Sequence, residues 1–328
     1  MKFSIVVPTY NQYYYLRESL TSIVVQSFTD YEVVVVDDNS TDDSNNLIRE
    51  FCRKDPRFRN IRNRTNVGQG QSRNIGADQS RGEYLLFLDS DDWIERNLLQ
   101  ELNRKIAEFR YDLIFFDYFK VYDDGEKILE RGPVFDDACL RERLSAVTSL
   151  LGYFSVPWNK AYRRQFYQTN SLTYPEGSYE DIVCSYQALL LSESRGVIRE
   201  PLYNYRHRPG TVRTKPNIKP NSVNHDDVFK RFKQIFDYLQ DRNEPDSIRA
   251  EIFRMMMHRY AGLLCVRVTS NRCEFFSKCC GHVDKYFVQA DRKWHLRDWV
   301  IYLLFKFRYM RLMLLGNKLY LTIVKAIK

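Results

Sequence analysis

The sequence predicts an α/β fold with a mostly parallel, doubly wound sheet flanked by helices, followed by a helical C-terminal region. Three observations support this prediction. Apolar, β-branched runs at 3–7, 31–36 and 84–88 have the uninterrupted pattern of strands buried on both faces. Helical periodicity alternates with these runs. Beyond residue 219 the patterns are mainly helical, which predicts a separate region there.

Two amphipathic helices are predicted in the first half of the chain. The first follows Asn11, and its apolar face consists of Leu16, Leu20, Ile23 and Val24. The second follows segment 40–43, which supplies an N-cap and first-turn acids, and its face consists of Leu47, Ile48 and Phe51. Because each helix lies between two strands, right-handed crossovers and a parallel sheet follow.

The composition is that of an ordered globular protein, with 44% hydrophobic and 28% charged residues. The seven cysteines are odd in number and scattered, so we expect thiols rather than a disulfide framework. The N-terminus lacks a signal-peptide pattern. These features predict a reduced, cytoplasmic setting.

Polar segments follow the strands at 8–11, 37–40 and 89–92. Ligands of such sheets bind where the carboxyl ends of the strands converge. The aspartates at 89, 91 and 92 repel one another unless a cation neutralises them, which predicts Mg²⁺ or Mn²⁺ bound together with diphosphate oxygens. A simple acidic loop that caps the helix near Glu95 is the alternative.

The segments 37–38 and 66–76 have weaker signals. One carboxylate of Asp37 and Asp38 can accept the N3–H of uracil while Tyr10 stacks on the ring, although helix capping explains the pair equally. Segment 66–76 is not a dinucleotide fingerprint, because the third glycine of that motif would fall at Arg73. We expect a turn into a helix, with Arg73 directed toward phosphates or toward Asp89.

Five ordered motifs within about residues 1–120 together resemble the family 2 glycosyltransferases of the GT-A fold, of the bacterial surface-polysaccharide type. They are Pro8-Thr-Tyr-Asn11, Asp37-Asp-Asn-Ser-Thr-Asp42, Asn66-x-Gly68 with Ser-Arg73-Asn, Gly82-Glu-Tyr, and Leu88-Asp-Ser-Asp-Asp-Trp93. The resemblance implies a nucleotide site formed by Pro8, Tyr10, Asp38, Asn66, Arg73 and Asp89. It implies a metal site in which Asp91 is the leading ligand and Asp89 contributes.

The second half of the chain resembles the family less closely. Glu180 and Asp181 precede an apolar helical run and are similar to the family's Glu-Asp pair, in which the aspartate is the general base. Helix capping is the alternative for both acids. By resemblance, Trp158 and Lys160 line the acceptor site, although Trp158 suits the core equally well.

A basic segment near residue 207 completes the predicted site. By resemblance, His207 binds metal, and its neighbours Arg206 and Arg208 bind the diphosphate. A surface loop is the alternative for this segment.

The predicted catalytic domain spans 1–218, with a nucleotide-sugar half at 1–117 and an acceptor half at 118–218 that opens with a hairpin turning at 124–125. The helical region spans 219–328. Its tail, 290–328, has nine Lys and Arg against two Asp, a net charge of +7. Since the overall charge is +8, the main domain is nearly neutral and a nucleic-acid groove is not expected.

The tail is too frequently charged to span a bilayer, which needs about 20 apolar residues. A basic, aromatic-rich helix suits an anionic headgroup layer, which predicts peripheral association with the inner face of the cytoplasmic membrane. Packing on the catalytic domain and homo-oligomerisation through the C-terminal helices are the alternatives.

Together these features predict an inverting glycosyltransferase of the hexosyltransferase type. It uses Mn²⁺ or Mg²⁺ and a nucleotide-sugar donor, with a UDP-sugar favoured. The acceptor is a hydroxyl of a glycan or lipid-linked molecule in capsule, lipopolysaccharide or similar polysaccharide biosynthesis. A nucleotidyltransferase, or a catalytically inactive membrane-associated scaffold on the same fold, are the alternatives.

Overall fold

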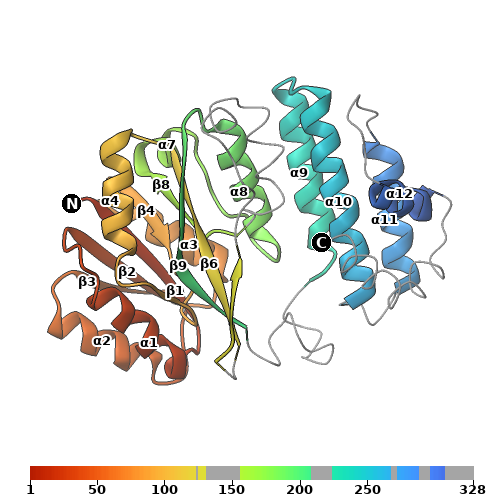
Figure 1. The fold of residues 1–328 in the computed structure, drawn as a ribbon. Helices are drawn as coiled ribbons and strands as arrows, with labels where there is room; N and C mark the ends of the chain where they lie inside the picture. The colour runs from red at the N-terminus through yellow and green to blue at the C-terminus, as the bar shows by residue number, and fades with distance from the viewer. Residues whose placement is uncertain (123–124, 131–155, 208–223, 267–271, 288–295, 307–328) are drawn as a thin grey trace. The chain divides into compact units, whose positions relative to one another are not determined.

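The computed structural model describes residues 1–122, 125–130, 156–207, 224–266, 272–287 and 296–306 (Figure 1). The chain divides into two compact units, Met1–Arg208 and Pro209–Lys328. The predicted domain boundary at 218 lies outside the described residues, as do position 124 of the predicted hairpin turn and most of the basic tail.

The first half of unit 1 alternates strands and helices. Its elements are β1 (Phe3–Thr9), α1 (Tyr13–Val24), β2 (Tyr31–Asp37), α2 (Ser44–Lys54), β3 (Phe58–Arg62), α3 (Gln69–Asp78), β4 (Tyr84–Phe87), β5 (Trp93–Ile94) and α4 (Leu98–Glu108). The three predicted strands and both predicted helices are therefore confirmed within one to three residues at each end. The strand β3 was not predicted, because its partly buried sequence lacks an apolar run.

The second half of unit 1 adds antiparallel strands to the sheet. Its elements are β6 (Leu113–Tyr122), β7 (Lys127–Glu130), β8 (Lys160–Arg163), α7 (Arg164–Thr169), α8 (Glu180–Leu191) and β9 (Arg195–His207). The predicted hairpin is confirmed as β6 paired antiparallel with β7. Gly125 in its turn has a φ of 85°, a left-handed conformation that glycine adopts without steric cost.

One nine-stranded sheet runs in the order β3-β2-β1-β4-β8-β6-β9-β5, with β7 paired to β6. Strands β3, β2, β1 and β4 are parallel, so their carboxyl ends meet at one edge. Strand β5 pairs with β9 through Trp93 opposite Asn204. This pairing brings the segment that follows β4 beside the end of β9.

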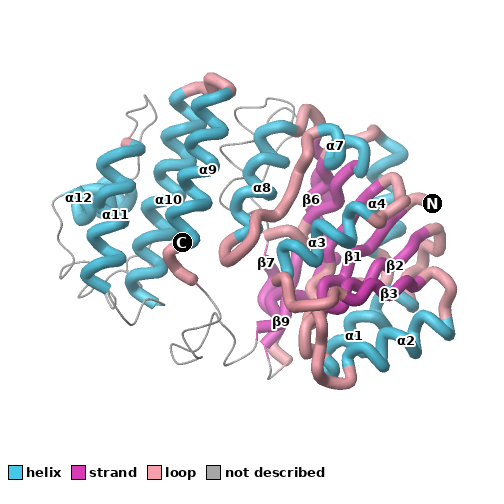
Figure 2. The backbone as a smooth tube through the Cα atoms, turned by 180° about the vertical axis from the view of Figure 1, so that it is seen from behind, coloured by secondary structure: helices cyan, strands magenta, loops and turns pink. Residues whose placement is uncertain are grey.

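Helices cover both faces of the sheet, which explains why the consecutive residues 5–7 of β1 and 33–36 of β2 are all apolar. Alternate residues of β1, Phe3, Ile5 and Val7, belong to the core with α1, α2 and α4. Helix α3 covers the opposite face (Figure 2). A Cβ on Gly76 of α3 would lie 2.3 Å from a methyl of Val6, so this glycine permits the close approach of the helix.

Unit 2 consists of helices. They are α9 (Asp227–Asp241), α10 (Asp246–Val266), α11 (Arg272–Tyr286) and α12 (Leu296–Lys306). Helix α12 contacts α10 and α11. Its Asp298 is buried and accepts a 2.6 Å hydrogen bond from His258. No helix in the described part of the chain is both long and apolar enough to cross a membrane.

Candidate active site

The loops after β1 and β2 are tied together at the carboxyl edge of the sheet. Asn11 has a φ of 52°, and its side-chain oxygen accepts a 2.8 Å hydrogen bond from the Thr41 amide. The Asn11 amide donates in turn to Ser40 Oγ at 3.0 Å. This reciprocal pairing fixes the segment that carries Tyr10, whose side chain is 45% exposed and available for stacking. Pro8 lies within β1 and is buried.

The two acids after β2 have different surroundings. Asp37 is fully buried and accepts hydrogen bonds from the Ser40 amide and the Asn45 side chain, so it organises the loop. Asp38 accepts hydrogen bonds of 2.8 Å from the amides of Val67 and Gly68.

The side-chain amide of Asn63 also donates a hydrogen bond to Asp38, at 2.8 Å. A carboxylate has about four acceptor positions, so these three bonds leave one for a ligand. Gly68 has a φ of 88°, which explains why glycine stands where the amide must turn toward Asp38. Asn66, in the same loop, is exposed.

The acidic loop after β4 is anchored through Asp92. This side chain is 1% exposed, accepts a 2.7 Å hydrogen bond from the Tyr203 hydroxyl, and accepts another from the Arg206 amide at 2.8 Å. Burial, together with the charges of Asp91 and Asp89, raises the pKa of Asp92 well above its usual range. Asp92 therefore attaches the loop to β9.

Arg73 joins the acidic loop to the start of α8. Its guanidinium is 2% exposed and forms ion pairs of 2.7 Å with Asp89 and 2.9 Å with Glu180. Burial opposes the charge, but the two carboxylates outweigh it and raise the Arg73 pKa above its ordinary value. Gln69, one turn earlier on α3, also donates to Glu180 at 2.9 Å. Arg73 is thus occupied by protein carboxylates in this structure.

The Glu180-Asp181 pair begins α8 after an unusual backbone conformation. Tyr179 has a φ of 60°, which is uncommon for a non-glycine residue and is found mainly at functional sites. Burial raises the pKa of Glu180, and the charge of Asp181 adds to the effect. Asp181 is half-buried and forms no hydrogen bond or ion pair with any described residue. Of the two acids, Asp181 is the one available to a substrate.

The structure buries Trp158 and Lys160, the two residues that the sequence predicts at the acceptor site. Trp158 is 3% exposed and stacks on Tyr203 and Tyr205 at centroid distances of 4.4 and 5.3 Å, so its ring belongs to the core. Lys160 is 1% exposed, and its ammonium group donates to the Val156 carbonyl. Burial lowers the pKa of Lys160 to about 7, while the charges of Cys184 and Asp181 oppose this shift.

The basic segment at the end of β9 is only partly described. Arg206 donates to the Asp91 carbonyl at 2.8 Å, pairs with Glu18 at 2.5 Å, and lies over the Trp93 ring. Its guanidinium therefore supports the acidic loop in this structure. The His207 ring lies 4.7 Å from that of Tyr122. Arg208 lies outside the described residues.

Asp89 and Asp91 are the two carboxylates of the acidic loop that the sequence predicts as ligands of a cation. Among the residues that the structure describes, no three His, Cys, Asp or Glu side chains form a group that could hold a metal ion, so Asp89, Asp91 and His207 are not gathered into one site. Mg²⁺ is commonly bound by one or two carboxylates together with substrate phosphates. Asp91 and the second oxygen of Asp89 fit this pattern if a diphosphate supplies the other ligands.

Sequence reasoning missed two residues that position the site. Tyr203 holds Asp92 from 111 residues away, and Glu18 holds Arg206 from 188 residues away. Neither has a local motif, and a tyrosine within a strand or a glutamate on a helix surface is ordinary. Only the pairing of β5 with β9 brings Tyr203 to the acidic loop.

Residues 4–170 match the family described as glycosyl transferase family 2. Glycosyltransferase GlyA of Streptococcus pneumoniae is 32% identical over 222 residues, which cover 64% of this chain and 31% of GlyA. EpsH of Bacillus subtilis is 31% identical over 287 residues, which cover 84% of this chain and 80% of EpsH. The chain thus spans less than a third of GlyA but most of EpsH.

The chain is also similar to a third glycosyltransferase, both in sequence and in fold. Poly(ribitol-phosphate) beta-N-acetylglucosaminyltransferase TarS of Staphylococcus aureus is 28% identical over 79% of this chain and 44% of TarS. The crystal structure of TarS residues 1–349 in complex with UDP-GlcNAc has a TM-score of 0.72 and 24% identity, covering 97% of this chain and 89% of that chain. This likeness confirms the predicted GT-A fold.

Proposed function

The chain belongs to glycosyl transferase family 2, and from that premise we propose that it transfers a sugar from a nucleotide-diphosphate sugar to a hydroxyl acceptor with inversion of the anomeric configuration. The observation that carries this proposal is the Arg73 bridge between the acidic loop and the start of α8. It joins Asp89 of the acidic loop to Glu180, the neighbour of Asp181, at one edge of the sheet, which supports a single site for the proposed cation and base. The proposed acceptor belongs to a cell-surface polymer; the name of the relative TarS gives poly(ribitol-phosphate) for that protein.

The donor is proposed to be a UDP-sugar. Asp38 keeps one acceptor position for the uracil N3–H, and the exposed Tyr10 ring offers a face for stacking. The TarS structure with the same fold contains UDP-GlcNAc, which supports a uridine nucleotide. Pro8, Asn66 and Asp89 complete the proposed contacts with the nucleoside.

Asp91 and Asp89 are proposed to hold Mn²⁺ or Mg²⁺ together with the donor diphosphate. A bound cation would neutralise the charge that develops on the departing diphosphate. The protein's part is to fix the two carboxylates, which Arg73 and Asp92 do from either side. His207 remains a proposed ligand of the cation, and Arg206 and Arg208 remain proposed contacts of the diphosphate.

Asp181 is proposed to be the general base. An acceptor hydroxyl is a poor nucleophile, and a carboxylate within hydrogen-bond reach takes its proton as the oxygen attacks the anomeric carbon. Attack opposite the leaving diphosphate inverts the configuration. Glu180 is occupied by Arg73 and Gln69, so its proposed part is to position Asp181.

Substitution of Asp91 by alanine tests the donor site. We expect Mn²⁺ and UDP together to raise the melting temperature of the wild-type protein, and the variant to lose the Mn²⁺-dependent part of this shift. Transfer should fall by about 100-fold or more, because a Lewis acid contributes several kcal/mol. Scanning fluorimetry and release of nucleoside diphosphate provide the two measurements.

The matched control for this test is Asp78→Ala, which removes an exposed acid at the far end of α3. It should behave like the wild type. Release of pyrophosphate in place of nucleoside diphosphate would identify a nucleotidyltransferase. No nucleotide-dependent stabilisation in the wild-type protein would favour a binding or scaffold protein.

We propose that unit 2 associates peripherally with an anionic membrane. Three exposed apolar side chains lie around Tyr302 and form what we call the α12 patch: Phe287, Trp299 and Leu303, which are 37%, 44% and 42% exposed. The Phe287 ring stacks on Tyr302 at 4.8 Å. The +7 charge of segment 290–328 complements anionic headgroups, and aromatic side chains favour that interface.

Glutamate substitutions at Trp299 and Leu303 test the α12 patch. We expect the double variant to bind phosphatidylglycerol vesicles at least about tenfold more weakly in a sedimentation assay, because burying each side chain contributes about 1.5–3 kcal/mol. Phe109→Glu, at a 57% exposed position in unit 1, is the control and should bind as the wild type does. Equal binding of both variants would rule out this patch as the membrane contact.

A further inference from the structure

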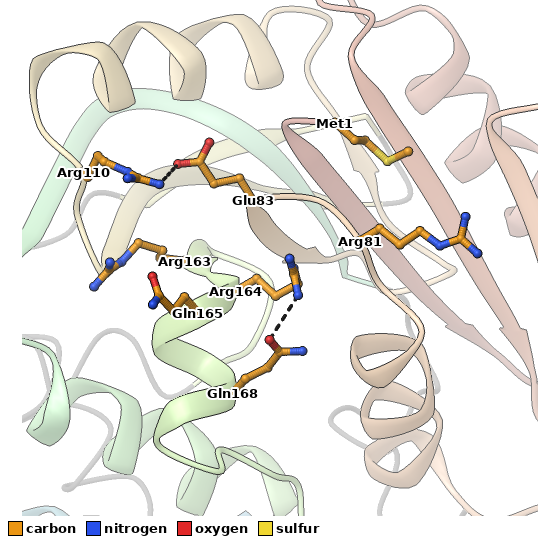
Figure 3. A pocket seen from close by; sticks show the side chains of 8 residues that line it. All are labelled: Met1, Arg81, Glu83, Arg110, Arg163, Arg164, Gln165 and Gln168. Atoms are coloured by element: carbon orange, nitrogen blue, oxygen red, sulfur yellow. Dashed lines mark hydrogen bonds and ion pairs between the residues drawn. The ribbon is translucent and has the colours of Figure 1, made fainter.

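A second polar pocket lies in unit 1, at the opposite edge of the sheet from the proposed donor site (Figure 3). Its volume is about 490 Å³. Its charged and polar lining includes Arg81, Glu83, Arg110, Arg163, Arg164 and Gln168. Glu83 directly precedes β4, whose other end leads to Asp89. Glu83 and Asp89 are six residues apart, which in an extended chain is a distance of about 20 Å.

Two nearby carboxylates are already paired with other protein groups. Glu83 pairs with Lys2 through one oxygen and with Arg110 through the other, both at 2.9 Å. Asp112 pairs with Arg163 through one oxygen. Its other oxygen accepts hydrogen bonds from the backbone amides of residues 193 and 194. Both oxygens of each acid therefore already accept a hydrogen bond, and neither acid pairs with Arg81 or Arg164.

Arg81 and Arg164 keep uncompensated charges. Within the described ranges of the chain, neither guanidinium forms an ion pair. Figure 3 shows Arg81 on one side of the pocket and Arg110 with Arg163 on the other, with Arg164 between them. Arg110 and Arg163 are paired with Glu83 and Asp112, so the charges of Arg81 and Arg164 are the ones that an anion in the pocket would balance.

The Arg164 guanidinium is held in place before any ligand binds. Its Nε donates to the Gly82 carbonyl at 2.7 Å, and its Nη1 donates to Gln168 at 3.1 Å. Gly82 is itself fixed, because its amide donates to Ser4 Oγ at 2.7 Å and a Cβ there would lie 2.5 Å from the backbone of Phe3. Within the described part of the chain, these two bonds leave the Nη2 atom of Arg164 without a hydrogen-bond partner, so the guanidinium needs little further ordering to bind a ligand.

We propose that this pocket binds a phosphate group, with Arg81 and Arg164 as its main donors. The planar guanidinium matches phosphate oxygens in pairs and remains charged at all physiological pH values. The volume lies in the range of about 300–1,000 Å³ that is typical of small-molecule sites, which leaves room for a group esterified to the phosphate. The phosphate has two sources, a free phosphorylated molecule or the phosphodiester of an anionic polymer.

Calorimetric titration of the full chain with inorganic phosphate at low salt tests the site. Arg81→Gln and Arg164→Gln should each raise the Kd about tenfold, the loss of one charge-assisted hydrogen bond. Arg53→Gln removes an exposed arginine from α2 and should leave the Kd unchanged. Arg81 contributes to the fold only through its backbone amide, so this variant should retain the wild-type melting temperature.

Two further titrations identify the source of the phosphate group and test whether its site is separate from the proposed donor site. A poly(glycerol phosphate) oligomer that binds more tightly than inorganic phosphate, and depends on Arg81, would identify a polymer as the source. Inorganic phosphate that the oligomer does not displace would identify a free phosphorylated molecule. Absence of saturable binding of both probes, an unchanged Kd in Arg81→Gln, or loss of phosphate binding on saturation with UDP would each overturn the proposal.

Discussion

Replacement of Asp181 by asparagine should lower kcat for sugar transfer by about 1,000-fold, within the range of 10² to 10⁴ for loss of a general base. Asparagine keeps the shape of the side chain but does not accept a proton. Asp181 forms no hydrogen bond or ion pair with a described residue, so within the described part of the chain its replacement breaks no such bond. The affinity for UDP with Mn²⁺ should stay within about twofold of the wild-type value.

A single-turnover assay of nucleoside diphosphate release measures the rate of transfer. A calorimetric titration with UDP measures the affinity for the nucleotide. Glu176→Gln is the matched control, since Glu176 is an exposed acid in the segment that leads to α8. It should retain kcat within a factor of about two. Transfer by Asp181→Asn at more than a tenth of the wild-type rate would assign the base to another residue.

The parallel half of the sheet could be predicted from the sequence because its physical cause is local. Strands buried on both faces require apolar side chains at every position, as in 33–36, and no polar residue interrupts them. The polar segments at the carboxyl ends followed from the same argument. The left-handed Gly68 likewise gave a local signal for the start of α3.

The remainder of the site depends on contacts between distant segments. Trp158 and Lys160 lie in a segment whose local sequence suited an acceptor site, yet the fold buries both. A fully buried lysine is rare, so no pattern argument would place Lys160 in the core. The Arg73 contact with Glu180 joins residues 107 positions apart, and periodicity does not encode such a pairing. Local sequence thus located the acids and predicted the contact of Arg73 with Asp89, but not its contact with Glu180.

The Arg73→Met variant should lose about 3–5 kcal/mol of unfolding free energy, the usual cost of removing one partner of a buried ion pair. Methionine fills a similar volume, so the loss reports charge more than packing. Glu180 is left buried at 4% exposure without its cation, and Asp89 loses the contact that orients it. The rate of transfer should therefore fall together with the free energy of unfolding. Urea unfolding measures the stability, and the transfer assay measures the activity.

Addition of Glu180→Gln to Arg73→Met should restore a large part of the lost stability, because it removes the buried charge that had become unpaired. The pH dependence gives an independent check. Loss of Arg73 raises the already elevated pKa of Glu180 further, so the folded state binds a proton that the unfolded state releases. The variant should then lose stability as pH rises from about 4.3, the unfolded value, through the raised pKa. A loss below about 1 kcal/mol in Arg73→Met, or no recovery in the double variant, would show that Arg73 does not hold the acidic loop and α8 together.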